Sequence, residues 1–183
     1  HDHDPALPEQ VRSSALFVSF GGYEESPEIA LILHERIIEV SQDPSNETVI
    51  LVAHGEKTDE GDARWLSVMN ANIERLKKDP HCATLKAIRA TTVREDWPEK
   101  RDKAVAELRQ MVVSHAEEGR VLVIADRLYG AGPYKKLLAD LDYVLNEKGL
   151  LHPLITRWLE REIGRRTTVL MSAPESADDI RQK

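Results

Sequence analysis

Apolar and polar positions follow two patterns along this chain. Residues 49–53, which follow Thr48, and residues 121–125 are continuous apolar runs of strand length. Elsewhere, apolar residues recur every three or four positions, which is the spacing of an amphipathic helix. Continuous apolar runs are typical of parallel strands that are covered on both faces. The pattern therefore predicts buried strands that alternate with helices.

Proline marks the start of most of the predicted helices. A proline in the first turn has a preset φ and gives up an N–H group that would lack a partner there. Gly119 is predicted to end the long charged helix in a left-handed conformation. The helix-starting prolines are Pro27 (after the candidate cap Ser26), Pro98, Pro133 and Pro153.

The remaining elements follow from the same periodicities. Residues 65–76 have the spacing of a helix, residues 84–93 are predicted to form a second strand, and residues 143–145 a short edge strand. Strands alternating with helices indicate βαβ units. We therefore expect an α/β fold with an open sheet of about four parallel strands and helices on both faces.

The predicted sheet also organises the chain. Residues 27–164 are expected to form one domain, with residues 1–26 as an N-terminal extension and residues 165–183 as a polar, mobile tail. Right-handed crossovers place the loops after residues 53, 93 and 125 at the same edge of the sheet. Ligands bind beyond the carboxyl ends of parallel strands, so this edge is the predicted site.

Composition narrows the function classes. The net charge of −7 argues against nucleic-acid binding, which needs a basic surface. The single cysteine, Cys82, excludes an internal disulfide and a zinc site built from several cysteines. No apolar run approaches the roughly 20 residues that cross a bilayer, so no membrane partner is expected.

His54 is the leading candidate for chemistry. It stands where the first apolar run stops, so its imidazole is offered to the predicted cleft. Imidazole binds metals and accepts protons near neutral pH. A hydrogen-bonded loop histidine is the alternative at this position.

The third loop differs from the rest of the acidic chain by its positive charge. Arg127, Lys135 and Lys136 lie at or next to a predicted helix start, and Arg94 lies in the second loop. Helix N-termini favour anions. These residues predict a polycarboxylate ligand, and a solvated helix surface is the alternative.

Several short stretches within residues 27–164 occur together in a recognisable order. On these stretches the chain resembles the CbiX-type sirohydrochlorin chelatases, the small class II chelatases of cobalamin and sirohaem synthesis. The matching stretches are residues 43–44, 47–55, 64–66, 92–96, 119–124 and 148–153, with Trp158.

The resemblance implies a flavodoxin-like half-domain that faces a second half across a tetrapyrrole cleft. The second half is expected from a homodimer or from another chelatase half. The implied reaction inserts Co²⁺ or Fe²⁺, as a substrate, into sirohydrochlorin or a related tetrapyrrole, with no organic cofactor. A cytoplasmic location follows from the family, whereas the start at residues 1–4, without Met, suggests export.

The resemblance also implies roles for particular residues. His54 matches the family's metal-binding and proton-accepting histidine. Glu56 is expected beside it in the catalytic step, and Asp126 and His152 are expected as further metal ligands. Tyr134, taken as a substrate-binding residue, stands where the family often has a second histidine.

That departure leaves a second hypothesis open. A phenol with a reference pKa of about 10 is a poor ligand for a divalent metal at pH 7. The chain is therefore either a chelatase or a protein that binds metal or tetrapyrrole without turnover. A purely structural partner domain is a third interpretation.

Overall fold

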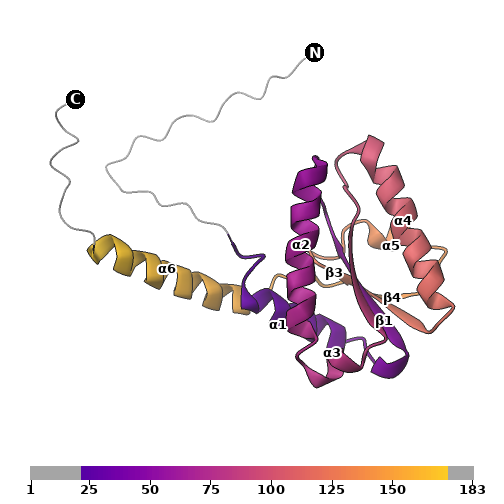
Figure 1. The fold of residues 1–183 in the computed structure, drawn as a ribbon, viewed down its shortest axis with the longest axis horizontal. Helices are drawn as coiled ribbons and strands as arrows, with labels where there is room; N and C mark the ends of the chain where they lie inside the picture. Colours follow the sequence, from indigo (N-terminus) through magenta and orange to yellow (C-terminus); the bar gives the residue numbers. More distant parts are fainter. Residues whose placement is uncertain (1–21, 173–183) are drawn as a thin grey trace, which may run out of the picture.

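The computed structural model describes residues 22–172, with side chains to residue 168. Four parallel strands form one sheet in the order β2-β1-β3-β4 (Figure 1). This confirms the predicted α/β, flavodoxin-like open sheet. The strands are β1 (Glu47–Ala53), β2 (Ala87–Thr92), β3 (Arg120–Ala125) and β4 (Val144–Asn146).

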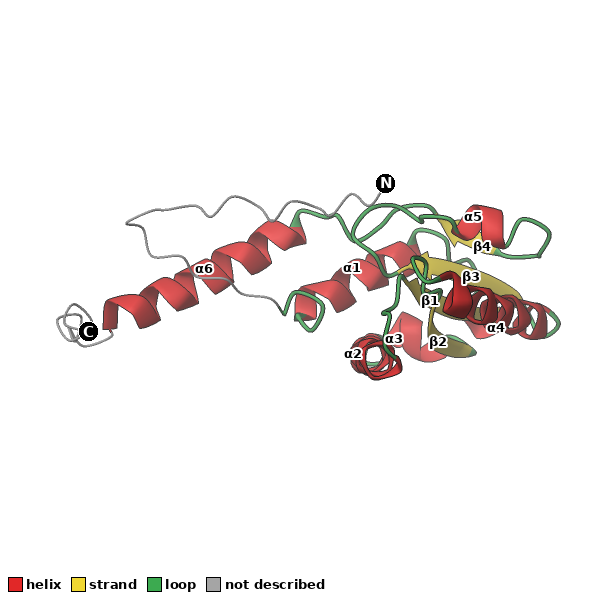
Figure 2. Ribbon diagram, turned by 90° about the horizontal axis from the view of Figure 1, so that it is seen from above, coloured by secondary structure: helices red, strands yellow, loops and turns green. Residues whose placement is uncertain are grey.

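Helices cover both faces of this sheet. One face packs against α1 (Pro27–Ile38), α2 (Asp59–Leu76) and the short α3 (Pro80–Thr84), and the other against α4 (Pro98–Ala116) and α5 (Tyr134–Leu137). A 3₁₀ turn, η1 (Pro44–Asn46), leads into β1, and α6 (Leu154–Ser172) ends the described chain. Figure 2 shows α1 and α4 in separate layers on either side of the strands.

The apolar run of β1 supplies both cores. Side chains alternate across a strand, so Val49 and Leu51 enter the core beneath α1 and α2. Ile50 and Val52 enter the core beneath α4 and α5. All four are fully buried. This double burial explains why the run shows no polar alternation.

Two predicted boundaries differ from the structure. The strand predicted at residues 84–93 begins only at Ala87, and Thr84 belongs to the short helix α3. Asp79 caps α3 by accepting hydrogen bonds from the N–H groups of His81 (2.9 Å) and Cys82 (3.2 Å). The predicted helix from Pro133 ends early, at Leu137.

Gly119 serves a different purpose from the one predicted. It is not among the residues with positive φ, so it does not form a left-handed helix end. A Cβ atom there would lie 2.4 Å from the backbone oxygen of Asn46. Glycine is needed because two backbone segments approach closely at this point.

Helix α6 continues through Gly164 to Ser172 and passes the boundary predicted at residue 165. It projects away from the sheet (Figures 1 and 2). The rings of Trp158 and Tyr23 pack at a tilt with their centres 5.0 Å apart, and Arg161 pairs with the buried Glu28, so the first half of α6 is anchored. Residues 1–21, which are most of the predicted extension of residues 1–26, and residues 173–183 of the tail lie outside the described residues.

Within residues 22–172, no helix combines the length and the apolar character that a membrane span requires.

Candidate functional site

Three loops meet at the carboxyl edge of the sheet, as the topology predicts. The N–H of Glu95, after β2, donates to the carbonyl oxygen of His54, after β1, at 3.3 Å. Arg127, after β3, donates from Nη1 to Oε1 of Glu95 at 2.6 Å. These contacts bring the three predicted loops into one assembly.

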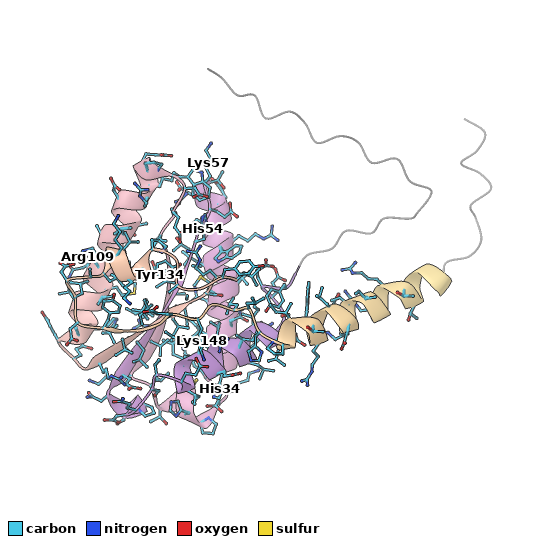
Figure 3. The ribbon with its side chains drawn as sticks, turned by 180° about the vertical axis from the view of Figure 1, so that it is seen from behind. His34, His54, Lys57, Arg109, Tyr134 and Lys148 are labelled. Atoms are coloured by element: carbon cyan, nitrogen blue, oxygen red, sulfur yellow. The ribbon has the colours of Figure 1, made fainter. Side chains whose placement is uncertain are left out.

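His54 is half-buried at the end of β1 (Figure 3). Its Nδ1 lies 3.0 Å from the carbonyl oxygen of Gly55, and its Nε2 lies 3.2 Å from Oδ2 of Asp96. Both partners are acceptors, so either ring nitrogen can donate to the oxygen that it faces. Trp97 packs at 5.7 Å against the imidazole, nearly perpendicular to it. The ring is therefore oriented by contacts at both nitrogens, one of them with a carboxylate.

Gly55 and the buried Asp62 fix the backbone next to this histidine. Gly55 has φ of 86°, and a Cβ there would lie 2.8 Å from Asp62 Oδ1 and 2.9 Å from Thr92 Cβ. The same Asp62 oxygen accepts from Thr92 Oγ1 at 2.9 Å and from the N–H of Glu56 at 3.1 Å. The Glu56 backbone is therefore held in place, while its side chain is exposed to solvent.

Arg94, predicted to bind substrate, holds the first loop instead. It donates to the carbonyl oxygens of Glu56 (2.7 Å) and Lys57 (2.6 Å) and to Asp59 Oδ1 (2.7 Å). Its backbone adopts φ of 48°, a conformation that is unusual outside glycine. Hydrogen bonds from Lys100 and then Arg94 lower the pKa of Asp59 to about 2. Arg94 thus acts as a clamp on the loop that carries Glu56.

The three predicted cations of the third loop have different surroundings. Arg127 is paired with Glu95, and Lys135 Nζ lies 2.7 Å from Glu147 Oε1. Lys136 is exposed and lines a groove between α4 and α5. Of the predicted anion contacts, Lys136 therefore fits that role best.

Tyr134 is a core residue, which corrects the prediction that it binds substrate. Its side chain is fully buried, and its hydroxyl donates to the carbonyl oxygen of Val52 at 3.1 Å. Burial raises its pKa well above the ordinary value. Arg127 lies above the ring, 5.9 Å from its centre. Tyr134 therefore packs in the core, where it contacts the end of β1 and Arg127 of the third loop.

Asp126, predicted as a metal ligand, is buried. Its carboxyl has no hydrogen bond or ion pair within the described part of the chain and lines a cavity of about 170 Å³ with Tyr23 and Trp65. Burial, and then the nearby charge of Glu24, raises its pKa to about 7. Near neutral pH much of it is protonated, which makes it a poor guide for a cation.

His152 does not join His54. Its Nε2 lies 2.9 Å from Oε2 of Glu35 on α1, and its Nδ1 accepts from the N–H of Leu154 at 3.1 Å. These contacts cap α6 and tie it to α1. The prediction of His152 as a second metal ligand at the site is therefore not supported by its placement.

A groove of about 710 Å³ lies beside the His54–Asp96 pair. Its size is within the range of small-molecule sites. Asp96 borders both the groove and the imidazole, so the two features adjoin. The groove is lined by residues 93, 95 and 96 after β2, by residues 101, 102, 105, 106 and 109 of α4, and by residues 133, 136 and 137 around α5.

Arg101 and Arg109 are groove residues that were not predicted from the sequence. They flank Val105 at intervals of four, which places all three on one side of α4. That spacing was the available signal. Arg109 donates to the carbonyl oxygen of Leu137 and to Asp140, both at 2.6 Å, so it also ties α4 to the α5 region.

The comparisons with known proteins add no assignment. No protein-family model, no curated protein and no solved structure matches this chain. The resemblance to chelatases therefore depends on the sequence stretches described above. In residues 22–172, no group of three closely spaced metal-ligating side chains includes His54.

Proposed function

We propose that the protein is a metal chelatase of the CbiX type, which inserts Co²⁺ or Fe²⁺ into sirohydrochlorin or a related tetrapyrrole. The observation that carries the proposal is the oriented His54 imidazole, with Nε2 at 3.2 Å from Asp96 Oδ2 beside an open groove. It is a proton acceptor at the edge where parallel sheets bind ligands.

Proton removal is the step that His54 is suited to perform. Metal insertion requires two pyrrole N–H protons to leave the macrocycle. The ring nitrogen that is unprotonated in neutral His54 accepts one proton, and the other leaves to solvent. The imidazolium that results is stabilised by Asp96. General base catalysis of this kind contributes about 10²–10⁴-fold in rate.

The groove supplies charges for the substrate's carboxylates. Lys136 and Arg101 line it, and neither has a carboxylate from another element as its salt-bridge partner in the described chain. Arg109 shares its charge with Asp140. The exposed Glu56, on the clamped loop, is placed to attract the aquated cation before insertion. In this proposal Arg127 and Lys135 act mainly in support.

A second copy of the chain, or another chelatase half, is the proposed cover of the substrate. A planar macrocycle lying on the edge of one sheet has its other face exposed. The proposed pairing of two copies is tested by measuring whether the molecular mass of the protein in solution doubles when the tetrapyrrole is added.

The reaction is tested by anaerobic incubation with sirohydrochlorin and Co²⁺. The absorption spectrum of the metallated product should form faster than the spontaneous rate, and His54→Ala should remove most of that excess. A wild-type rate equal to the spontaneous rate would refute the proposal.

His152→Asn is the matched control. An asparagine side chain can accept from the N–H two residues on, as in an Asx turn, so it can replace His152 as the acceptor for Leu154. The proposal expects this variant to retain the wild-type rate, because His152 contacts Glu35 and Leu154. Loss of activity in His152→Asn alone would transfer the metal site to the base of α6.

Binding without turnover is the second candidate function. The buried Asp126 and the core position of Tyr134 favour it, because they remove two candidate ligands from the vicinity of His54. Calorimetric binding of sirohydrochlorin, without a metallated spectrum after Co²⁺ is added, would select this alternative.

A further inference from the structure

A second group of metal-ligating side chains lies far from His54. His34 on α1 meets Asp79 and Cys82 at the start of α3. One ligand atom from each lies within 4.8 Å of the other two. Figure 3 shows His34 near the bottom of the α/β body and His54 in its upper part.

The His34 ring nitrogen is the most informative atom of this group. Nε2 is buried and lacks a hydrogen bond within the described residues, although Asp79 Oδ1 lies 3.1 Å away. The two atoms are close enough for an ion pair when the ring is protonated, but their geometry is not that of a hydrogen bond. An unsatisfied buried nitrogen is costly unless it has a partner. A cation between nitrogen and carboxylate would satisfy both.

The other two ligands are held in place by the fold. Asp79 Oδ1 is fixed by the N–H groups of His81 and Cys82, the kind of hydrogen bonding that orients carboxylate ligands. Cys82 is only 2% exposed and packs in the core beneath α1 and α2. His34 and Asp79 are partly exposed, so an ion has a path from solvent.

We propose that His34, Asp79 and Cys82 form a site for Zn²⁺ or a similar borderline-soft divalent ion, with the fourth position open to water. Zinc takes imidazole nitrogen, carboxylate oxygen and thiolate sulfur in tetrahedral geometry. Bond lengths of about 2.0–2.3 Å place such ligands about 3.3–3.8 Å apart. Small side-chain rotations bring three atoms within 4.8 Å to these separations.

The site differs from the proposed chelatase site in chemistry and in purpose. It contains sulfur, and it joins α1 to α3 instead of opening onto the groove. Formation of the metal–sulfur bond releases the thiol proton to solvent, so binding strengthens as pH rises. Burial, and then Asp79, raises the pKa of Cys82 to about 11, which agrees with a protonated thiol before the ion binds. The bound ion would link α3 to α1, and it would thereby also hold the edge strand β2 that follows α3.

Cobalt substitution tests the site on the full chain. Co²⁺ should bind in one equivalent with a near-ultraviolet thiolate-to-cobalt charge-transfer band, and added Zn²⁺ should displace it. Cys82→Ala should abolish the band, and His34→Gln should weaken Zn²⁺ binding by about 100-fold or more, since even outer partners of a metal ligand are worth 10–100-fold.

The control is His54→Ala, which should retain the band and the Zn²⁺ affinity. This separates the two proposals, because chelatase activity and the charge-transfer band fail independently. Circular dichroism checks that each variant is folded, and the partly exposed His34 is a safe position for the second variant. A folded wild type without the band, or unchanged Zn²⁺ affinity in both ligand variants, would overturn the site.

Discussion

Two buried carboxyl groups lie at opposite ends of the sheet, Glu47 at the start of β1 and Asp126 just after β3. Glu47 accepts hydrogen bonds from Ser41, from the N–H groups of Gln42 and Asp43, and from Arg120. Burial acts to raise its pKa, but these bonds outweigh burial and lower it.

Asp126 has no such partners in the described chain, and its pKa is raised to about 7. The two ends therefore solve the problem of a buried carboxyl group differently. At the amino end the charge is kept and surrounded by donors, as a structural ion pair requires. At the carboxyl end the proton is kept, which is the kind of perturbation that collects at functional sites.

Removing Glu47 should have the largest effect on stability. Glu47→Ala leaves the Arg120 guanidinium and two backbone N–H groups without their acceptor, and we expect a loss of about 3–5 kcal/mol in the free energy of unfolding. Urea denaturation measures it. Glu74→Ala, which removes an exposed pair with Lys77, should change stability by less than about 1 kcal/mol. Equal losses of stability in Glu47→Ala and Glu74→Ala would show that the buried Glu47 charge is not a structural ion pair.

Replacing Asp126 should act in the opposite direction. The pKa of Asp126 is 3.8 in the unfolded chain and about 7 in the folded protein. Between pH 3.8 and about pH 7, Asp126 therefore ionises only in the unfolded chain, and the free energy of unfolding of the wild type falls as pH rises through this range. Asp126→Asn should remove this loss and stabilise the protein at pH 8 by at most about 4 kcal/mol. Thermal unfolding from pH 4 to 8 tests this against Asp142→Asn at an exposed position. Destabilisation at pH 8 would contradict the raised pKa of Asp126.

Gly55 tests the backbone strain that accompanies the candidate site. Its φ is 86°, and an added methyl carbon would lie 2.8 Å from Asp62 Oδ1, so Gly55→Ala should cost about 1–3 kcal/mol and displace His54. Gly164→Ala, in the open middle of α6, should instead stabilise by up to about 1 kcal/mol. If Gly55→Ala binds the tetrapyrrole and unfolds like the wild type, the loop after β1 does not require the positive φ of Gly55.

The exposed pair between Lys135 and Glu147 should have the smallest effect. Lys135→Ala should change the free energy of unfolding by less than about 1 kcal/mol, because the lysine side chain is 76% exposed. Under the proposed function it should also affect KM for the tetrapyrrole less than Lys136→Ala does. A larger rise in KM for Lys135→Ala would restore Lys135 as a main substrate contact.

Much of the fold could be predicted from periodicity. The apolar runs around Val49 and Val121 are buried strands, and Pro27 and Pro98 begin helices where expected. These features depend on local spacing and on burial of both sheet faces. The helix at residues 80–84 was missed because a single capping residue, Asp79, determined it.

The sequence by itself determined that an imidazole would stand at the carboxyl edge of a parallel sheet, because strand direction and crossover handedness follow from the order of elements. Only the tertiary structure decided which neighbours carry usable charge. Arg94 became a clamp, Tyr134 a core residue and Asp126 a carboxyl group with a raised pKa, since partners distant in the chain and burial determine these states. The meeting of His34 with Cys82 is likewise a product of packing between α1 and α3, which no local pattern encodes.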